Sequence, residues 1–468
     1  MIKIFHQEYY NWKILQTEEE VRELAEKMKA SSTIYYDTET SGLRVRHEGE
    51  DYMVGLTVAV DDEIDETVYY LPLRHVFEGE FDTGRIILED LGLRPSDFPD
   101  FNPEMLAGEW YNLDYGSTME IMRGVFEGGT APRAKKQRIV ADNIMFDLHV
   151  LACEGVDIEK LFEHFNIFDT MVAIHTFDEE AEKKLETVVK NSYGVHKVDF
   201  SLVRRTVSKE EKKSVGLKAS QNACFQHIQI PIGGVYSIED VWFMKQMVDD
   251  LIEAMKNDEQ LDNFYDYRMP FVPVLWRMER RGMKVSVERC KAMAEKAEKE
   301  LEKLSYRIYE LCGVEFNINS GQQLAEILFG FRKTLKDKKT GDYSIKGNDH
   351  IINNAFAFTP VSWTDGGKEK DKKLKMPQTN AEVLEELLSQ EIPKKGKSAP
   401  SQLARERTEH EGREVVTLLL KFAKLEKLYS SFMIGLLEQL YSDGKAHPSF
   451  NICGTDSWRL SCDSPNLN

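Results

Sequence analysis

The order in which strand-like and helical patterns follow one another constrains the fold of this chain most strongly. Within residues 1–255, runs rich in β-branched and aromatic residues (SSTIYYDTETSGL, MVGLTVAV, TVYYLPL and RIVADN) are interspersed with helical patterns such as EEEVRELAEKMK and IEDVWFMKQMVDDLIEAM. We expect MVGLTVAV and TVYYLPL to form a hairpin in one sheet. The alternation predicts an α/β domain over this part of the chain.

The pattern changes after that domain. Long amphipathic helices dominate residues 256–440, and basic residues gather in loops at about 331–378. We therefore predict a mostly α-helical module with an enlarged basic tip. Residues 78–133 show no clear period, and we interpret them as an irregular insertion in the first domain. Residues 441–468 look like the start of a further domain, too short to pack alone.

Composition excludes several classes of protein. Hydrophobic residues make up 41% of the 468 residues, which is typical of a globular protein and excludes wholesale disorder. No run of 18 apolar residues and no secretory signal occurs, so we expect no membrane association. The six cysteines form no CxxC pair, which argues against zinc or a disulfide framework and favours a cytoplasmic location. The net charge of −19 argues against general coating of nucleic acid and still permits local basic surfaces.

Two carboxylates stand at the end of a strand-like run, in Asp37-Thr38-Glu39. Side chains at i and i+2 of a strand point to the same face, so Asp37 and Glu39 would lie side by side. Two carboxylates at such a short separation repel one another unless a cation lies between them. Hard oxygen ligands of this kind suit Mg²⁺ or Mn²⁺. An acidic chain also produces such tripeptides by chance, as solvated surface groups.

Two helical motifs carry further candidate residues. An i,i+4 spacing places Asn143 with Asp147, and Tyr236 with Asp240, each pair on one helix face. Asp147 and Asp240 would add two carboxylates to the site, and Tyr236 a hydroxyl group. Each motif also has an ordinary structural interpretation, namely a helix start with a surface Asp, and an interfacial Tyr bonded to a helix Asp.

Taken together, the three motifs carry a resemblance. In their order DxE, NxxxD and YxxxD, they resemble the DEDD-type 3′–5′ exonucleases of the subclass with a tyrosine, and the FDTM stretch at 168–171 is similar too. The resemblance implies that Asp37, Glu39, Asp147 and Asp240 hold two divalent cations, Mg²⁺ or Mn²⁺, ~3.5–4 Å apart. It implies that Tyr236 orients the attacking water.

The same resemblance implies contacts with the DNA strand. Leu43 matches the position of an apolar wedge against the terminal base, and Asn143 could steady the sugar–phosphate. The expected reaction is hydrolysis of the terminal phosphodiester of a DNA 3′ end, which releases a 5′-nucleotide.

The second half resembles family A (polymerase I-like) DNA polymerases. MPFVPVLWRMERRGMKV, FNINSGQQL and TNAEVLEEL are similar to the thumb, and HPSFN with GTDSWRLSCDSPNLN to the first palm segment. The resemblance implies a ribonuclease H-like exonuclease domain (1–255), a helical thumb (256–440) and a truncated palm (441–468). It implies DNA contacts by Asn317, Ser320, Arg459 and Asn466; the family's Thr-Gly before the arginine is Ser-Trp here.

The later palm aspartates and the fingers helix of that family are absent from the sequence. We therefore expect a split, phage-like polymerase that acts in the host cytoplasm, interrupted by a split gene, an intervening sequence or an intein. A second polypeptide would be needed for DNA synthesis. Besides the single-stranded 3′ end and the primer–template duplex, a processivity factor could bind at the thumb tip. The basic stretches Lys135–Arg138, Arg204–Lys213 and Arg332–Lys375 would contact the DNA backbone.

Two alternatives stay open. The first is a 3′–5′ exoribonuclease of the same carboxylate class. The second is a non-catalytic, DNA-binding half of a split polymerase. The presence of all four carboxylates and of Tyr236 favours an active nuclease over the second alternative.

Overall fold

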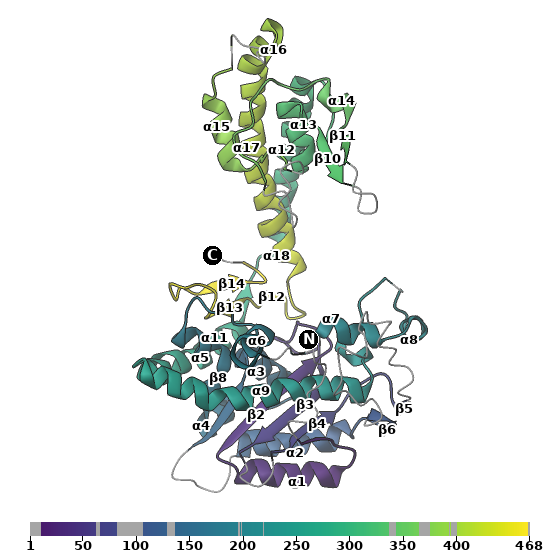
Figure 1. Cartoon of the computed structure of the whole chain (residues 1–468), viewed down its shortest axis with the longest axis vertical. Helices are drawn as coiled ribbons and strands as arrows, with labels where there is room; N and C mark the ends of the chain where they lie inside the picture. The colour runs from purple at the N-terminus through teal and green to yellow at the C-terminus, as the bar shows by residue number, and fades with distance from the viewer. Residues whose placement is uncertain are drawn as a thin grey trace. The chain divides into compact units, whose positions relative to one another are not determined.

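The chain forms two compact units in a computed structural model (Figure 1). The first unit is made by residues 1–284 and 440–468, and the second by residues 285–439. The structure describes residues 11–61, 66–81, 106–128, 136–194, 197, 199–218, 220–336, 343–364, 375–392, 394 and 400–466.

A mixed six-stranded sheet with the order β1-β4-β3-β2-β7-β8 forms the centre of the first unit. The strands are β1 (Trp12–Ile14), β2 (Thr33–Thr40), β3 (Met53–Val60), β4 (Val68–Pro72), β7 (Gln137–Ala141) and β8 (Phe165–Asp169). The predicted hairpin of β3 and β4 is confirmed, since the two pair antiparallel. Strand β2 pairs antiparallel with β3 and parallel with β7, so it lies inside the sheet.

Helices flank the sheet, and their bounds follow. They are α1 (Glu18–Ala30), α2 (Tyr115–Gly128), α3 (Ile144–Cys153), α4 (Ile158–His164), α5 (Thr170–Phe177), α6 (Leu185–Tyr193), α7 (Phe200–Val203), η4 (Arg204–Thr206), α8 (Lys209–Ser214), η5 (Phe225–His227), α9 (Ile230–Asn257), α10 (Leu261–Asn263), η6 (Phe264–Arg268) and α11 (Met269–Arg281). Smaller sheets pair β5 (Gly79–Phe81) with β6 (Gly108–Trp110), β9 (Met283–Lys284) with β12 (Lys445–Ala446), and β13 (Ser449–Asn451) with β14 (Ser461–Asp463).

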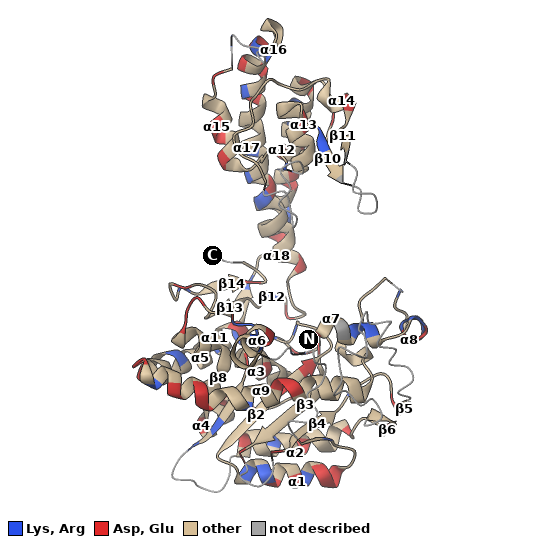
Figure 2. Ribbon diagram, in the orientation of Figure 1, with Lys and Arg blue, Asp and Glu red and all other residues tan. Residues whose placement is uncertain are grey.

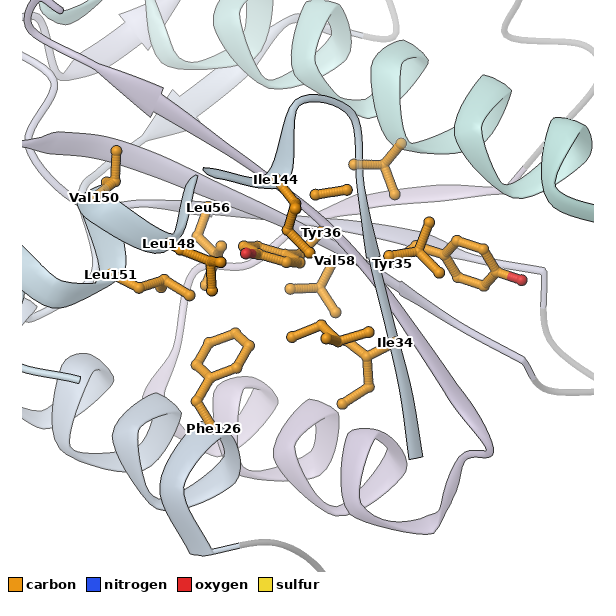
Figure 3. Packing of buried hydrophobic residues seen from close by; sticks show 14 of the residues in the cluster. Ile34, Tyr35, Tyr36, Leu56, Val58, Phe126, Ile144, Leu148, Val150 and Leu151 are labelled. Carbon is orange, nitrogen blue, oxygen red and sulfur yellow. The ribbon is translucent and has the colours of Figure 1, made fainter. Parts of the chain in front are cut away.

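The two faces of the sheet are covered by different helices. Tyr36 of β2 points toward Phe126 of α2, with ring centroids 5.7 Å apart (Figure 3). On the opposite face, the hydroxyl groups of Thr57 in β3 and Ser237 in α9 lie 2.6 Å apart. Because side chains alternate along β2, Asp37 and Glu39 face the side that α9 covers.

Helix α1 follows the predicted pattern. Thr17 and Glu20 form a reciprocal capping box at its first turn. Its first turn is acidic and its last turn carries Lys27 and Lys29, a separation that Figure 2 shows and that complements the helix dipole.

The expectation that residues 78–133 are irregular is wrong for part of that range. Tyr115–Gly128 forms helix α2, which packs on α1 and buries Met119, Met122 and Phe126. Apolar residues three and four apart form one helix face, and burial of such a side chain contributes ~1.5–3 kcal/mol. The signal was present in the sequence, but Gly116, Ser117 and Gly124 weaken it. Residues 82–105 and 129–135 lie outside the described part of the chain.

The second unit is mostly helical, as predicted, and has a core of its own. Its elements are α12 (Val287–Cys312), α13 (Gly321–Phe329), β10 (Lys333–Lys336), β11 (Tyr343–Lys346), α14 (Asp349–Ile352), α15 (Ala381–Ser389), α16 (Gln402–Arg407), η9 (Thr408–Gly412), α17 (Arg413–Lys427), η10 (Leu428–Ile434) and α18 (Gly435–Glu438). Ile308, Ile327, Leu387 and Val416 are fully buried in this core. In the predicted basic tip, β10 and β11 pair antiparallel, and residues 337–342 and 365–374 lie outside the described part.

The predicted fold class, an α/β part followed by a mostly helical part, is confirmed. All six cysteines are described and free, in line with the sequence. Within the described residues, every helix falls short of the length or apolar character that a bilayer crossing requires. The ranges 1–255, 256–440 and 441–468 for homologous domains stay a prediction.

Candidate carboxylate site

The carboxyl end of β2 carries the first two site residues. Asp37 lies opposite Thr57 of β3, and Glu39 lies opposite Gly55, just before an irregularity in the register. Side chains two residues apart on a strand point to the same face, so both carboxylates face the side of the sheet that α9 covers. The adjacent parallel strand β7 ends at Ala141, so the chain leaves β7 at the same end of the sheet as it leaves β2.

Helix α9 brings the third carboxylate to this place. Asp240 lies on α9, and one oxygen each of Asp37, Glu39 and Asp240 lie within 4.8 Å of one another. Glycine lets α9 approach the sheet closely: a Cβ atom at Gly234 would lie 2.8 Å from a side-chain carbon of Ile14. These three oxygens therefore form a hard-ligand set that suits Mg²⁺ or Mn²⁺ and fits the predicted type of cofactor.

Asp147 of α3 is held in position by hydrogen bonds from Thr38 of β2. Strand β7 pairs with β2 only as far as Tyr35, so the backbone N–H of Thr38 has no β7 carbonyl to bond. This N–H donates to Asp147 Oδ1 at 3.1 Å, and the hydroxyl of Thr38 donates to the same oxygen at 2.5 Å. A buried donor needs such a partner, and the bond fixes Asp147 beside Asp37. Asp147 is not among the three residues whose oxygens lie within 4.8 Å of one another.

The start of α3 is held by a carboxylate that the sequence did not single out as a site residue. Asp169, at the end of β8, accepts hydrogen bonds from the backbone N–H groups of Asn143 and Ile144, and from those of Met171 and Val172. It thereby ties the first turn of α3 to that of α5. Asn143 adopts a left-handed backbone conformation (φ 57°), which asparagine tolerates better than most residues. The sharp turn at Asn143 directs α3 toward β2.

Burial and mutual repulsion raise the pKa values of the carboxyl groups. Burial, reinforced by the charge of Asp240, raises the pKa of Asp37 to about 7, while Lys197 opposes the shift. Burial and then the charge of Asp37 raise the pKa values of Glu39 and Asp147 well above their usual range. Burial also raises the pKa of Asp240, against the effect of Lys197. A cluster with these shifts favours positive charge in its midst, which a divalent cation supplies.

Tyr236 lies one helical turn before Asp240 and lines the same pocket. Burial raises the pKa of its hydroxyl group well above the usual value, although Lys197 opposes the shift. The hydroxyl group therefore stays protonated at neutral pH and can donate a hydrogen bond. Such a group can orient a water molecule, but it cannot take up the proton of that water as a phenolate would.

A pocket of about 610 Å³ opens beside the cluster. Its lining includes Asp37, Asn143, Tyr236 and Asp240, together with Asp142 and Lys197. The pocket is large enough for one nucleotide, since small-molecule sites span roughly 300–1,000 Å³.

Asp142, Lys197 and Ser237 are residues of this site that sequence reasoning missed. Asp142 accepts a hydrogen bond from the hydroxyl of Thr170 at 2.5 Å, and its position at the end of β7 was a usable signal. Ser237 follows Tyr236 and lies 3.5 Å from Asp37 Oδ2. Lys197 lies in a segment without regular periodicity, so no local pattern points to it.

The predicted DNA contacts are spread over the chain. Leu43 follows β2, and 75% of its surface is exposed. Arg459 and Asn466 are exposed residues of the C-terminal segment in the first unit. Asn317 and Ser320 belong to the second unit, where the Ser320 hydroxyl caps α13. None of these five residues is among the described residues that line the pocket, whereas Asn143 is.

Comparison with known proteins points to one kind of relative. No family model matches the chain. It is 27% identical to DNA polymerase I of Bacillus subtilis over 64% of this chain, 22% identical to that of Chloroflexus aurantiacus over 95%, and 23% identical to that of Treponema pallidum over 96%. The chain is thus distantly similar to DNA polymerase I over most of its length. It spans only 26%, 36% and 37% of these relatives, in the same order.

A solved structure shares the fold of this chain. The POL domain of Pol1 from M. smegmatis, in complex with DNA primer-template and dNTP, superposes with a TM-score of 0.54. The match covers 98% of this chain and 55% of that one, at 14% sequence identity. The likeness confirms a DNA polymerase I-like fold.

Proposed function

We propose that this chain is a 3′–5′ exonuclease that removes nucleotides from a DNA 3′ end. The observation that carries the proposal is the convergence of Asp37, Glu39 and Asp240, whose oxygens lie within 4.8 Å of one another. The motif order and the distant homology to DNA polymerase I support DNA as the substrate.

Four carboxylates would hold two divalent cations in this proposal: those of Asp37, Glu39, Asp147 and Asp240. When bound, such cations supply an activated water and compensate the charge on the phosphate and on the leaving 3′ oxygen. The protonated hydroxyl of Tyr236 orients the attacking water.

The strand end would be held by neighbouring residues. Asn143 lines the pocket and can donate from its side-chain amide to the sugar–phosphate. Leu43 is exposed enough to stack against the terminal base. Base-edge readout is unnecessary, and frayed ends would enter most easily because unpairing costs them less.

The second unit and the C-terminal segment are proposed to bind the primer–template duplex, as thumb and first palm segment. Ser320 caps the start of α13 and Asn317 lies just before it, and the positive end of a helix dipole suits a phosphate. Arg459 and Asn466 are exposed and could reach DNA. A second polypeptide for DNA synthesis, a processivity factor at the tip, a phage origin and action in the cytoplasm stay predictions.

The double variant Asp37→Ala, Glu39→Ala tests the site. With a 5′-labelled single-stranded DNA and Mg²⁺, we expect the wild-type chain to shorten the strand stepwise from its 3′ end. The double variant should lose at least roughly a hundredfold of this activity, because charge stabilisation of the transition state is removed. Its circular dichroism spectrum should be unchanged.

A matched control removes two exposed carboxylates with the same spacing, in Glu300→Ala, Glu302→Ala on α12. This variant should keep wild-type activity. Wild-type activity in the variant Asp37→Ala, Glu39→Ala would reject the assignment of the nuclease site to these carboxylates. Faster degradation of an RNA strand of the same sequence would favour the exoribonuclease alternative, and an inert wild-type chain would favour the non-catalytic one.

A further inference from the structure

A buried lysine lies within the carboxylate cluster. The side chain of Lys197 is 1% exposed, and its Nζ atom lies 2.6 Å from Oδ1 of Asp240. The same atom lies 4.1 Å from the ring centre of Tyr236. Lysine is almost never fully buried unless it is paired, so this position reflects a specific attraction.

The charges around Lys197 keep its ammonium group positive. Burial alone would lower its pKa, but the charge of Asp240 and the hydrogen bond to that carboxylate raise the pKa well above the usual value. One positive charge therefore stands among Asp37, Glu39 and Asp240, where it partly offsets their repulsion. A divalent cation bound to these oxygens would offset the same repulsion between the carboxylates.

We propose that Lys197 is an internal cation that competes with a divalent cation for Asp240 and so sets how tightly the site binds metal. The inference rests on the proposed function, because it takes Asp240 to be a cation ligand. Binding of a divalent cation to Asp240 would require the ammonium group to move away or to tolerate a second positive charge nearby. Both effects weaken metal binding.

The proposal has a second consequence for the protein without added metal. Lys197 then supplies the counter-charge for Asp240, and removing it leaves a buried carboxylate without a partner, which is strongly unfavourable. Loss of Lys197 should therefore destabilise the protein in a chelator and should be compensated when a divalent cation is added.

Titration of the full chain with Mn²⁺, followed by electron paramagnetic resonance of the free ion, tests the proposal without measuring catalysis. We expect Lys197→Met to bind Mn²⁺ roughly tenfold more tightly than the wild type. Lys197→Arg keeps the charge and should bind like the wild type. Lys190→Met, the same change at an exposed position of α6, is the matched control and should have no effect.

A thermodynamic cycle shows whether the effect acts through Asp240. In an Asp240→Asn background, Lys197→Met should no longer change the Mn²⁺ affinity by more than roughly twofold, because the shared partner is gone. In EDTA, Lys197→Met should melt at a lower temperature than the wild type, and Mn²⁺ should restore its melting temperature. If Lys197→Met does not fold, Lys197→Gln removes the charge and retains a hydrogen-bond donor.

Unchanged or weaker Mn²⁺ binding by the uncharged variants would overturn the competition and leave the proposed nuclease site intact. A wild-type chain and a Lys197→Met variant that both fail to bind Mn²⁺ would instead contradict the proposed function itself.

Discussion

At the residue scale, the site depends on polar contacts that hold each carboxylate. Thr38 stands between Asp37 and Glu39, and its hydroxyl points to the side where α3 presents Asp147. Its backbone and side chain both donate to the same carboxylate oxygen. Neighbours of this kind that orient a metal ligand typically contribute ten- to a hundredfold to affinity or activity.

Replacement of Thr38 by valine tests this contact. Thr38→Val keeps the shape of the side chain and removes one of the two hydrogen bonds to Asp147. We expect the rate of 3′-end removal to fall roughly ten- to a hundredfold, because only the backbone N–H of residue 38 then holds Asp147. The kcat and KM on single-stranded DNA measure the effect.

Thr417→Val is the matched control, because its hydroxyl donates to the carbonyl of Arg413 in its own helix of the second unit. The control should behave like the wild type. A Thr38→Val variant with an unaltered rate would show that the backbone N–H alone positions Asp147.

At the element scale, the position of Asp147 depends on helices α3 and α5, which begin next to one another after strands β7 and β8. Asp169 accepts from four backbone N–H groups at the starts of α3 and α5. The carboxylate is 2% exposed, so water cannot replace it readily. One side chain thus fixes two helices, and α3 carries Asp147.

The variant Asp169→Ala should lower the free energy of unfolding of the first unit by about 2–4 kcal/mol, since two helix starts lose their caps. Asp157→Ala removes the cap of α4 alone and should cost about 1 kcal/mol, because water can reach that exposed site. Urea denaturation of both variants measures the difference. Equal losses would mean that Asp169 acts as an ordinary cap.

Sequence reasoning identified many elements but not all of the contacts between them. The strands β2 and β3 and the helix α1 were predicted near their observed bounds, and the amphipathic helices predicted within residues 256–440 include α12. Helix α2 was missed because glycine and serine weaken its pattern. The pairing of Lys197 with Asp240 depends on chain segments far apart, and no local pattern encodes such a contact.

The candidate site was predictable in part for the same reason. The spacing within each motif places Asp37 with Glu39, and Tyr236 with Asp240, on shared faces. The convergence of these motifs depends on the parallel pairing of β2 with β7 and on the close approach of α9. Periodicity within single elements does not determine either of these.

At the scale of the whole molecule, the two units have separate hydrophobic cores. The proposed nuclease residues belong to the first unit, and the core around Leu387 belongs to the second. Damage to one core should therefore be felt mainly in its own unit.

The variant Leu387→Ala tests this independence. Leu387 is a residue of α15 and is fully buried in the core of the second unit. Its truncation should destabilise this unit by about 2–5 kcal/mol. Differential scanning calorimetry should show one transition moved to lower temperature and a second transition unmoved. Removal of 3′ nucleotides from short single-stranded DNA should stay at the wild-type rate below the first transition. A proportional loss of nuclease activity would show that the units depend on each other.

The central claim is that distant carboxylates jointly hold divalent cations for hydrolysis of a strand end. X-ray diffraction of crystals of the full chain grown with Mn²⁺ and a 5′-nucleotide, recorded at the manganese absorption edge, tests it most directly. We predict anomalous density at bonding distance from the carboxylate oxygens of Asp37, Glu39 and Asp240. Saturating Mn²⁺ bound elsewhere, with these three oxygens free of metal, would contradict the account.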